Sequence, residues 1–146
     1  WNTAINYAVP MVEGLNLYLG YANESSDGTR DDDTEMTIGF DYTMGPVKIG
    51  YQHSEVEDAT AAADEVTAYG LNFAVNDDLT VSYSVTENEV KAIGATAGST
   101  AEATGINAAY SVGGGSLRIF SGETDNAGYT AGKTQKNTEI SLSMSF

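Results

Sequence analysis

The sequence predicts an all-β protein whose strands form an antiparallel up-and-down sheet. The last ten residues, 137–146 (NTEISLSMSF), show the pattern most clearly, because apolar and polar residues alternate there without a break. A period of two is typical of a strand with one apolar and one polar face. Two further observations agree: eight other segments alternate in the same way, and no helical period of 3.6 competes over a useful length.

The alternating segments divide the 146 residues into about nine strands. Short turns are expected at 10–14, 45–46, 76–78 and 113–115, where Gly, Pro, Asn and Asp are turn formers. Long loops are expected at 23–33, 54–65, 87–103 and 121–136. Short and long connections that alternate along the chain are typical of sequential antiparallel strands. The expected strands are 1–9, 15–22, 36–44, 47–52, 69–75, 79–85, 106–112, 116–119 and 137–146.

The two faces of these strands differ in chemistry. One face carries Leu, Ile, Val, Met, Tyr and Phe, and the other carries mostly Asn, Ala, Gly, Ser, Thr and a few charged residues. The second face cannot form a dry core, because each buried polar group without a partner costs roughly 1–3 kcal/mol. In a soluble fold of two sheets the apolar faces would pack on each other. In a transmembrane β-barrel they face lipid while the polar faces line a channel.

Aromatic residues at the short-turn ends of the strands favour the transmembrane barrel. They lie on the apolar face at a similar level, as an aromatic girdle at a membrane interface requires. The alternative is that tyrosine is simply common in strands. The predicted girdle consists of Tyr7, Tyr42, Phe73, Tyr110 and Phe146.

Composition excludes several other classes of protein. The chain has no cysteine, so disulfides and thiolate chemistry are unavailable. Six basic residues against 21 acidic ones give a net charge of −15, and nucleic acid is not expected as a partner because phosphate contacts need Lys and Arg. The only histidine, His53, has the parity of the apolar face and no nucleophile motif nearby. We therefore expect His53 to be interfacial and the protein not to be an enzyme.

Three stretches resemble the Gram-negative general porins, particularly those of alphaproteobacteria. They are GPVKIGYQHSEVED (45–58), YSVGGGSLR (110–118) and the terminal strand that ends on Phe146. The resemblance implies an outer-membrane barrel of 16 strands with short periplasmic turns, long external loops and both termini in the periplasm. It also implies a homotrimer in contact with lipopolysaccharide, and an assembly machinery that reads Phe146.

Nine strands are an odd number, and an open sheet would leave two unpaired edges in lipid. We therefore expect residues 1–146 to be the carboxy-terminal portion of a larger barrel, equivalent to the family's eighth to sixteenth strands. The family's pore-narrowing loop would then lie outside this chain. An eight-stranded barrel, in which residues 1–9 are not a strand, is the alternative.

The polar face supplies the candidate pore-lining residues. Lys48 and Arg118 are the only basic residues within the expected strands, and both have the parity of that face. The resemblance implies that such side chains face an acidic constriction loop across the pore, whereas the alternative is a solvated cation without a special role. The full set of candidates is Lys48, Arg118, Gln52, Asp41 and Glu139.

One acidic loop contains a candidate Ca²⁺ site formed by Asp27, Asp31, Asp32 and Asp33. Clustered carboxylate oxygens suit this ion, although the spacing does not match a calcium-binding loop. A solvated loop, or divalent bridging to lipopolysaccharide phosphates, are the alternatives. No other cofactor is expected.

The predicted function is passive diffusion of small hydrophilic solutes and ions through a water-filled channel. The alternative is a small outer-membrane or surface β-protein that binds a partner through the loops at 23–33, 87–103 and 121–136.

Overall fold

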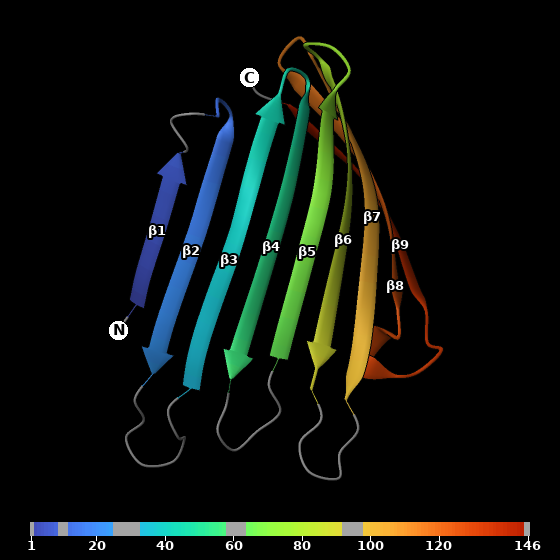
Figure 1. Cartoon of the computed structure of the whole chain (residues 1–146). Helices are drawn as coiled ribbons and strands as arrows, with labels where there is room; N and C mark the ends of the chain where they lie inside the picture. Colours follow the sequence, from blue (N-terminus) through green and yellow to red (C-terminus); the bar gives the residue numbers. More distant parts are fainter. Residues whose placement is uncertain (1, 9–11, 25–32, 58–63, 92–97, 145–146) are drawn as a thin grey trace.

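The computed structural model describes residues 2–8, 12–24, 33–57, 64–91 and 98–144. Within them, nine strands form one sheet in which each strand pairs antiparallel with the next along the chain (Figure 1). The predicted up-and-down topology is confirmed. The strands are β1 (Asn2–Ala8), β2 (Leu15–Glu24), β3 (Asp33–Met44), β4 (Val47–Glu57), β5 (Asp64–Ala74), β6 (Leu79–Val90), β7 (Ser99–Val112), β8 (Gly115–Asp125) and β9 (Gln135–Met144), with a short 3₁₀ helix, η1 (Ala127–Tyr129), before β9.

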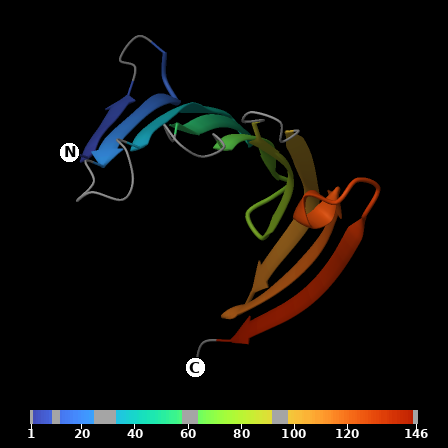
Figure 2. The same ribbon diagram turned by 90° about the horizontal axis from the view of Figure 1, so that it is seen from below.

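The sheet bends into an open arc with β1 at one end and β9 at the other (Figure 2). Neither outer edge pairs with another strand among the described residues. β1 pairs with β2 along its whole length, so the alternative in which residues 1–9 are not a strand is wrong. No helix in the described part of the chain is long and apolar enough to cross a membrane.

All four long loops are shorter than the sequence predicted, and β2 and β3 leave only 25–32 of the expected loop at 23–33. β4 and β5 extend into the expected loop at 54–65 and leave only 58–63 between them. In the same way, the expected loop at 87–103 is reduced to residues 91–98, and the expected loop at 121–136 is reduced to residues 126–134. These extensions carry polar residues in place of apolar ones on the convex face, so they continue the backbone ladder without the pattern that marks a strand. The alternative function, binding of a partner through the long loops, therefore has fewer loop residues available.

The short turns follow the expected chemistry. Gly113 and Gly114 have φ values of 56° and 82°, and a two-residue hairpin turn of type I′ needs positive φ at both positions. Gly45 has a φ of 58° and precedes a proline in the turn between β3 and β4. In the turn between β5 and β6, the side-chain oxygen of Asn76 accepts hydrogen bonds from the backbone N–H groups of Asp78 and Leu79, each at 2.9 Å.

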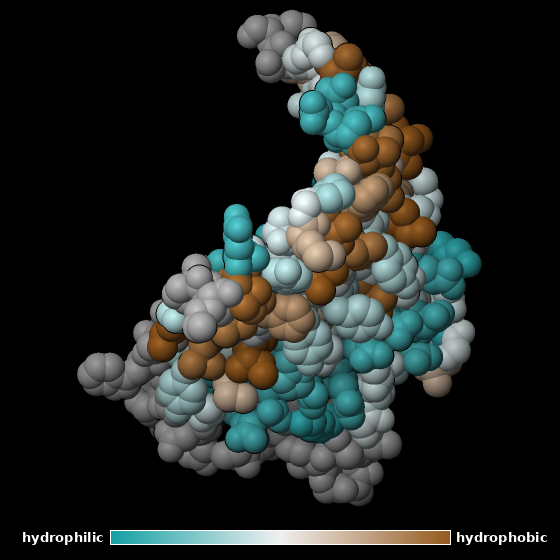
Figure 3. Space-filling model, turned by 45° about the horizontal axis from the view of Figure 1, so that its top comes forward, coloured by the Kyte–Doolittle hydropathy of each residue, from teal (hydrophilic) through white to brown (hydrophobic). Residues whose placement is uncertain are grey.

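The apolar face of the sheet has no second layer over it. Among the described residues only Val85 and Ala127 are buried hydrophobic residues, while Leu71 is 44% and Ile140 is 69% exposed. The pairing keeps this face continuous, because Leu17 lies opposite Phe40 and Phe40 lies opposite Tyr51. Figure 3 shows the hydrophobic side chains as a band along the convex side of the arc, with hydrophilic side chains gathered beside it.

Candidate functional site

The concave face holds all five candidate pore-lining residues. Asp41 lies opposite Gly50, which flanks Lys48 and Gln52 on the same face of β4. The row of paired residues continues from Gly50 across β5, β6 and β7 to β8 and β9. By this register Arg118 and Glu139 share the face of Asp41. That these residues line a pore stays a prediction.

Asp41 is the centre of a polar cluster on β2, β3 and β4. Its carboxylate accepts hydrogen bonds from the Asn16 amide at 3.0 Å and from the Tyr18 hydroxyl, and the Lys48 ammonium lies 3.3 Å away. Asp41 is only 8% exposed, so these partners compensate for the loss of water around its charge. The pairing and parity of the strands place the four side chains together, because Asn16 is directly opposite Asp41.

Lys48 presents its charge to solvent from this cluster. Its side chain is 53% exposed, compared with 11% for that of Asp41. The carboxylate therefore orients the ammonium group and compensates its charge without covering it. An exposed pair of this kind contributes about 0–1 kcal/mol to stability, so its main effect is on the local field at the concave face.

Arg118 belongs to a second cluster on β7 and β8. Its Nε donates a hydrogen bond to the side-chain oxygen of Asn107. Phe120, two residues along the same face, lies opposite Asn107 and covers two glycines. A Cβ atom added at Gly105 or Gly122 would lie 2.9 or 2.7 Å from the Phe120 ring. The glycines are therefore needed for the ring to lie against the backbone.

A row of small residues, which the sequence pattern alone did not predict, crosses the middle of the concave face. Gly50, Gly70, Ser84, Gly105 and Gly122 lie opposite one another on five successive strands. Glycine weakens a strand interior and often marks a bend or a close backbone approach. The sequence does show glycine recurring inside the alternating segments. Only the register between strands shows that these glycines form one row.

The predicted girdle residues lie on the convex face as far as they are described. Tyr7, Phe73 and Tyr110 are 53%, 41% and 43% exposed, and Tyr42 is half-buried opposite Ile49. Phe146 lies outside the described residues. Further along the same face the rings of Phe40 and Tyr51 stack, with centroids 6.0 Å apart. The placement agrees with a girdle, although the membrane role of these residues stays a prediction.

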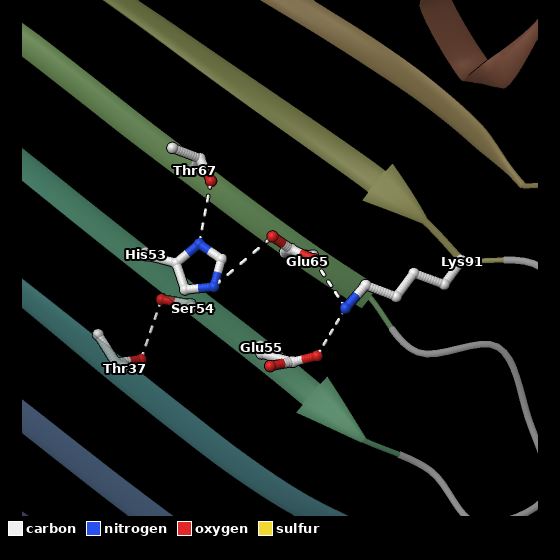
Figure 4. A network of polar contacts seen from close by, with 7 residues as sticks. All are labelled: Thr37, His53, Ser54, Glu55, Glu65, Thr67 and Lys91. Atoms are coloured by element: carbon white, nitrogen blue, oxygen red, sulfur yellow. Dashed lines mark hydrogen bonds and ion pairs between the residues drawn. The ribbon is translucent and has the colours of Figure 1, made fainter.

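His53 lies on the convex face, where the apolar band gives way to charged residues. Figure 4 shows His53 between Thr67 and Glu65, with Glu55 and Lys91 beside it. Its Nδ1 is 3.0 Å from the Thr67 hydroxyl, and its Nε2 is 3.6 Å from Glu65. Lys91, just beyond β6, contacts Glu55 at 2.7 Å and Glu65 at 2.8 Å. The sequence predicts His53 at an interface but not this network, because Glu55, Glu65 and Lys91 lie in stretches expected to be loops.

The contacts around Lys91 favour its charged form. The hydrogen bonds accepted by Glu55 and then Glu65 raise the pKa of Lys91 well above its usual value. A cation whose pKa is raised by folding stabilises the protein below its ordinary pKa, and this stabilisation is lost as the pH rises through the raised value. The contribution of Lys91 is therefore fully present at neutral pH.

Replacing Lys91 with methionine is expected to lower the thermal midpoint of the folded protein. Glu55 and Glu65 lie directly opposite each other, and like charges in that position repel when no cation is between them. The midpoint is measured from the loss of the folded band on unheated gels across a temperature series. Lys133→Met is the control, since Lys133 has no side-chain partner among the described residues. Equal midpoints for both variants would show that the network does not stabilise the sheet.

The predicted Ca²⁺ site is not tested by the structure. Asp27, Asp31 and Asp32 lie outside the described residues, and only the backbone of Asp33 is described. Elsewhere in the described part of the chain, no three His, Asp or Glu side chains are grouped so that they could hold a metal ion. One further expectation was wrong: Lys136 lies in β9 and pairs with Glu123 at 2.8 Å, so Lys48 and Arg118 are not the only basic residues within strands.

Comparison with known proteins identifies the family. A family model described as Gram-negative porin matches residues 1–146, which is the whole chain. The comparisons with curated proteins and with solved structures returned no match. The family match agrees with the antiparallel up-and-down sheet and with its exposed apolar face. The chain therefore belongs to the Gram-negative porin family, and its strands are transmembrane strands of the bacterial outer membrane.

Proposed function

We propose that the concave face forms part of the wall of a water-filled channel through which small hydrophilic solutes and ions diffuse passively. The observation that carries this proposal is the division of one continuous sheet into two faces. The convex face is apolar and uncovered, whereas the concave face carries Asp41, Lys48, Arg118 and a row of small residues. Lipid stabilises the apolar convex face, and water stabilises the polar concave face. No catalytic step is part of this function.

The channel requires more strands than the nine described. Both edges of the arc expose backbone N–H and C=O groups that have no partner strand among the described residues. In a bilayer each such group costs several kcal/mol, so a barrel must close. We infer that the sheet is the carboxy-terminal portion of a 16-stranded barrel, that the barrels associate as trimers in contact with lipopolysaccharide, and that the assembly machinery reads Phe146.

Reconstitution of the full-length native protein into planar lipid bilayers tests the proposal. Stepwise, ohmic increases in ion current are expected as single channels insert. The control is the same detergent preparation after heat unfolding. Folded protein that inserts, as shown by protection of its strands from protease, but carries no current would contradict a channel function.

Arg118→Glu is expected to shift the selectivity of the channel toward cations. The substitution replaces a positive charge on the concave face with a negative one, and fixed charges on a pore wall attract counter-ions. The reversal potential in a salt gradient measures the ratio of cation to anion permeability. Lys136→Glu is the control, since it makes the same charge change on the convex face. An unchanged ratio for Arg118→Glu would remove Arg118 from the pore lining.

A further inference from the structure

The concave face contains a hollow of about 460 Å³ that extends from β2 to β6. Its size lies within the range of about 300–1,000 Å³ that is typical of small-molecule sites. The lining that matters here consists of Tyr18, Lys48, Gln52, Gly50, Gly70 and Asn72. Because these residues come from adjacent strands of one hydrogen-bonded sheet, the sheet itself holds them in place.

The hollow exists because two glycines face each other across β4 and β5. Gly50 lies directly opposite Gly70, so no side chain covers the backbone at this point. A Cβ atom added at Gly50 would meet its nearest neighbour, the carbonyl oxygen of Phe40, at 3.8 Å. Space above Gly50 is therefore available to a solute or to a larger side chain.

Polar side chains surround these glycines on the same face. Lys48, Asn72 and Ser82 form a row of directly paired residues on the short-turn side, and Gln52 lies on the loop side of Gly50. The side chains of Asn72 and Ser82 have no hydrogen-bond partner among the described residues. Amide and hydroxyl groups that are not engaged with the protein can donate to and accept from a solute.

The charge and shape of the hollow select the class of solute. Asp41 compensates the charge of Lys48 from 3.3 Å, so the lining has little net charge. Tyr18, which is 38% exposed, donates its hydroxyl to Asp41; this hydrogen bond fixes the ring at the β2 end of the hollow. A fixed aromatic ring beside neutral donors and acceptors suits a molecule with both C–H faces and many hydroxyl groups.

We propose that this hollow is a binding subsite for small neutral polyhydroxylated solutes, of the chemical class of monosaccharides and disaccharides, on the wall of the channel. The inference rests on the proposed function, because solutes reach the concave face only if water fills it. The subsite adds a distinction between solutes: those of this class bind in the hollow, whereas other neutral molecules of similar size diffuse through the channel without binding.

Ion current through the full-length channel tests the subsite with glucose and maltose as probes. Binding is expected to reduce the single-channel current along a saturable curve. Tetraethylene glycol, which is neutral but lacks a ring and multiple hydroxyls, is expected to reduce it only linearly as conductivity falls. A current without any saturable effect of either sugar would overturn the subsite and leave the channel function intact. Absence of current in every condition would instead contradict the channel function itself.

Two kinds of variant locate the binding. Gly50→Leu fills the hollow and is expected to abolish saturation, while Ser143→Leu makes a similar addition on the same face of β9, outside the hollow, and is expected to leave saturation unchanged. Asn72→Ala removes a hydrogen-bonding group without adding bulk, and the apparent affinity should fall up to about tenfold. If Gly50→Leu does not assemble, Asn72→Ala and Gln52→Ala decide the question. Unchanged affinity in both alanine variants would overturn the proposal.

Discussion

Leu71→Arg is expected to block stable assembly of the protein in the outer membrane, whereas Asn72→Arg is expected to be tolerated. Leu71 is 44% exposed on the convex face, between Tyr69 and Phe73 in the middle of the apolar band. Arginine at the centre of the lipid-facing surface of a barrel costs about 2–4 kcal/mol. Asn72 is the next residue of β5 and lies on the concave face, where the water of the proposed channel would solvate an added charge.

The comparison is measured as the amount of folded, heat-modifiable protein in isolated outer membranes. Both variants introduce an arginine into the same strand at neighbouring positions. The strand propensity of arginine and the level of expression therefore affect the two variants alike. Equal yields, or a lower yield for Asn72→Arg than for Leu71→Arg, would mean that the two faces of β5 are assigned the wrong way round.

Gly14→Ala is expected to destabilise the protein by about 3 kcal/mol, the sum of backbone strain and overpacking. Gly14 has a φ of 83°, a conformation that is unfavourable for a residue with a side chain. A Cβ atom there would lie 2.2 Å from the carbonyl oxygen of Thr43. The backbone of Thr43 also donates a hydrogen bond to Gly14 at 2.9 Å, so the two segments cannot separate without losing it.

Gly45→Ala separates the two contributions. Gly45 also has a positive φ, 58°, but nothing lies within 4 Å of an added Cβ atom. Only the cost of the left-handed conformation remains, about 1–2 kcal/mol. Equilibrium unfolding in urea with lipid or detergent present measures both variants. A smaller loss for Gly14→Ala than for Gly45→Ala would contradict the close approach between Gly14 and Thr43.

The alternation of residues predicted most of the fold because it reflects a real difference between the two environments of the sheet. In β9 every predicted apolar position between 138 and 144 lies on the convex face. The prediction failed where that difference ends. The extensions of β4 to Glu57 and of β5 back to Asp64 place charged residues such as Glu55 and Glu65 on the convex face. Without apolar residues on that face the pattern that marks a strand is lost.

The candidate site was predictable only in part, for a related reason. Parity assigns Lys48 and Arg118 to a face, and the structure agrees with that assignment. Parity does not give the register between strands, which depends on turn geometry and pairing. The contacts of Asp41 with Asn16 and the packing of Phe120 on Gly122 depend on register, so they became visible only in the folded sheet.

The most direct test of the two-faced channel wall is cysteine scanning of residues 68–74 in β5 of the native, membrane-embedded protein. The 146 residues contain no cysteine, so each substitution introduces the only thiol of this part of the protein. The rate of reaction with a charged, water-soluble thiol reagent is measured at each position. We expect a period of two, with fast reaction at 68, 70, 72 and 74 and slow reaction at 69, 71 and 73. Uniform rates along the strand, or fast reaction at 69, 71 and 73, would contradict a sheet with lipid on its convex face and water on its concave face.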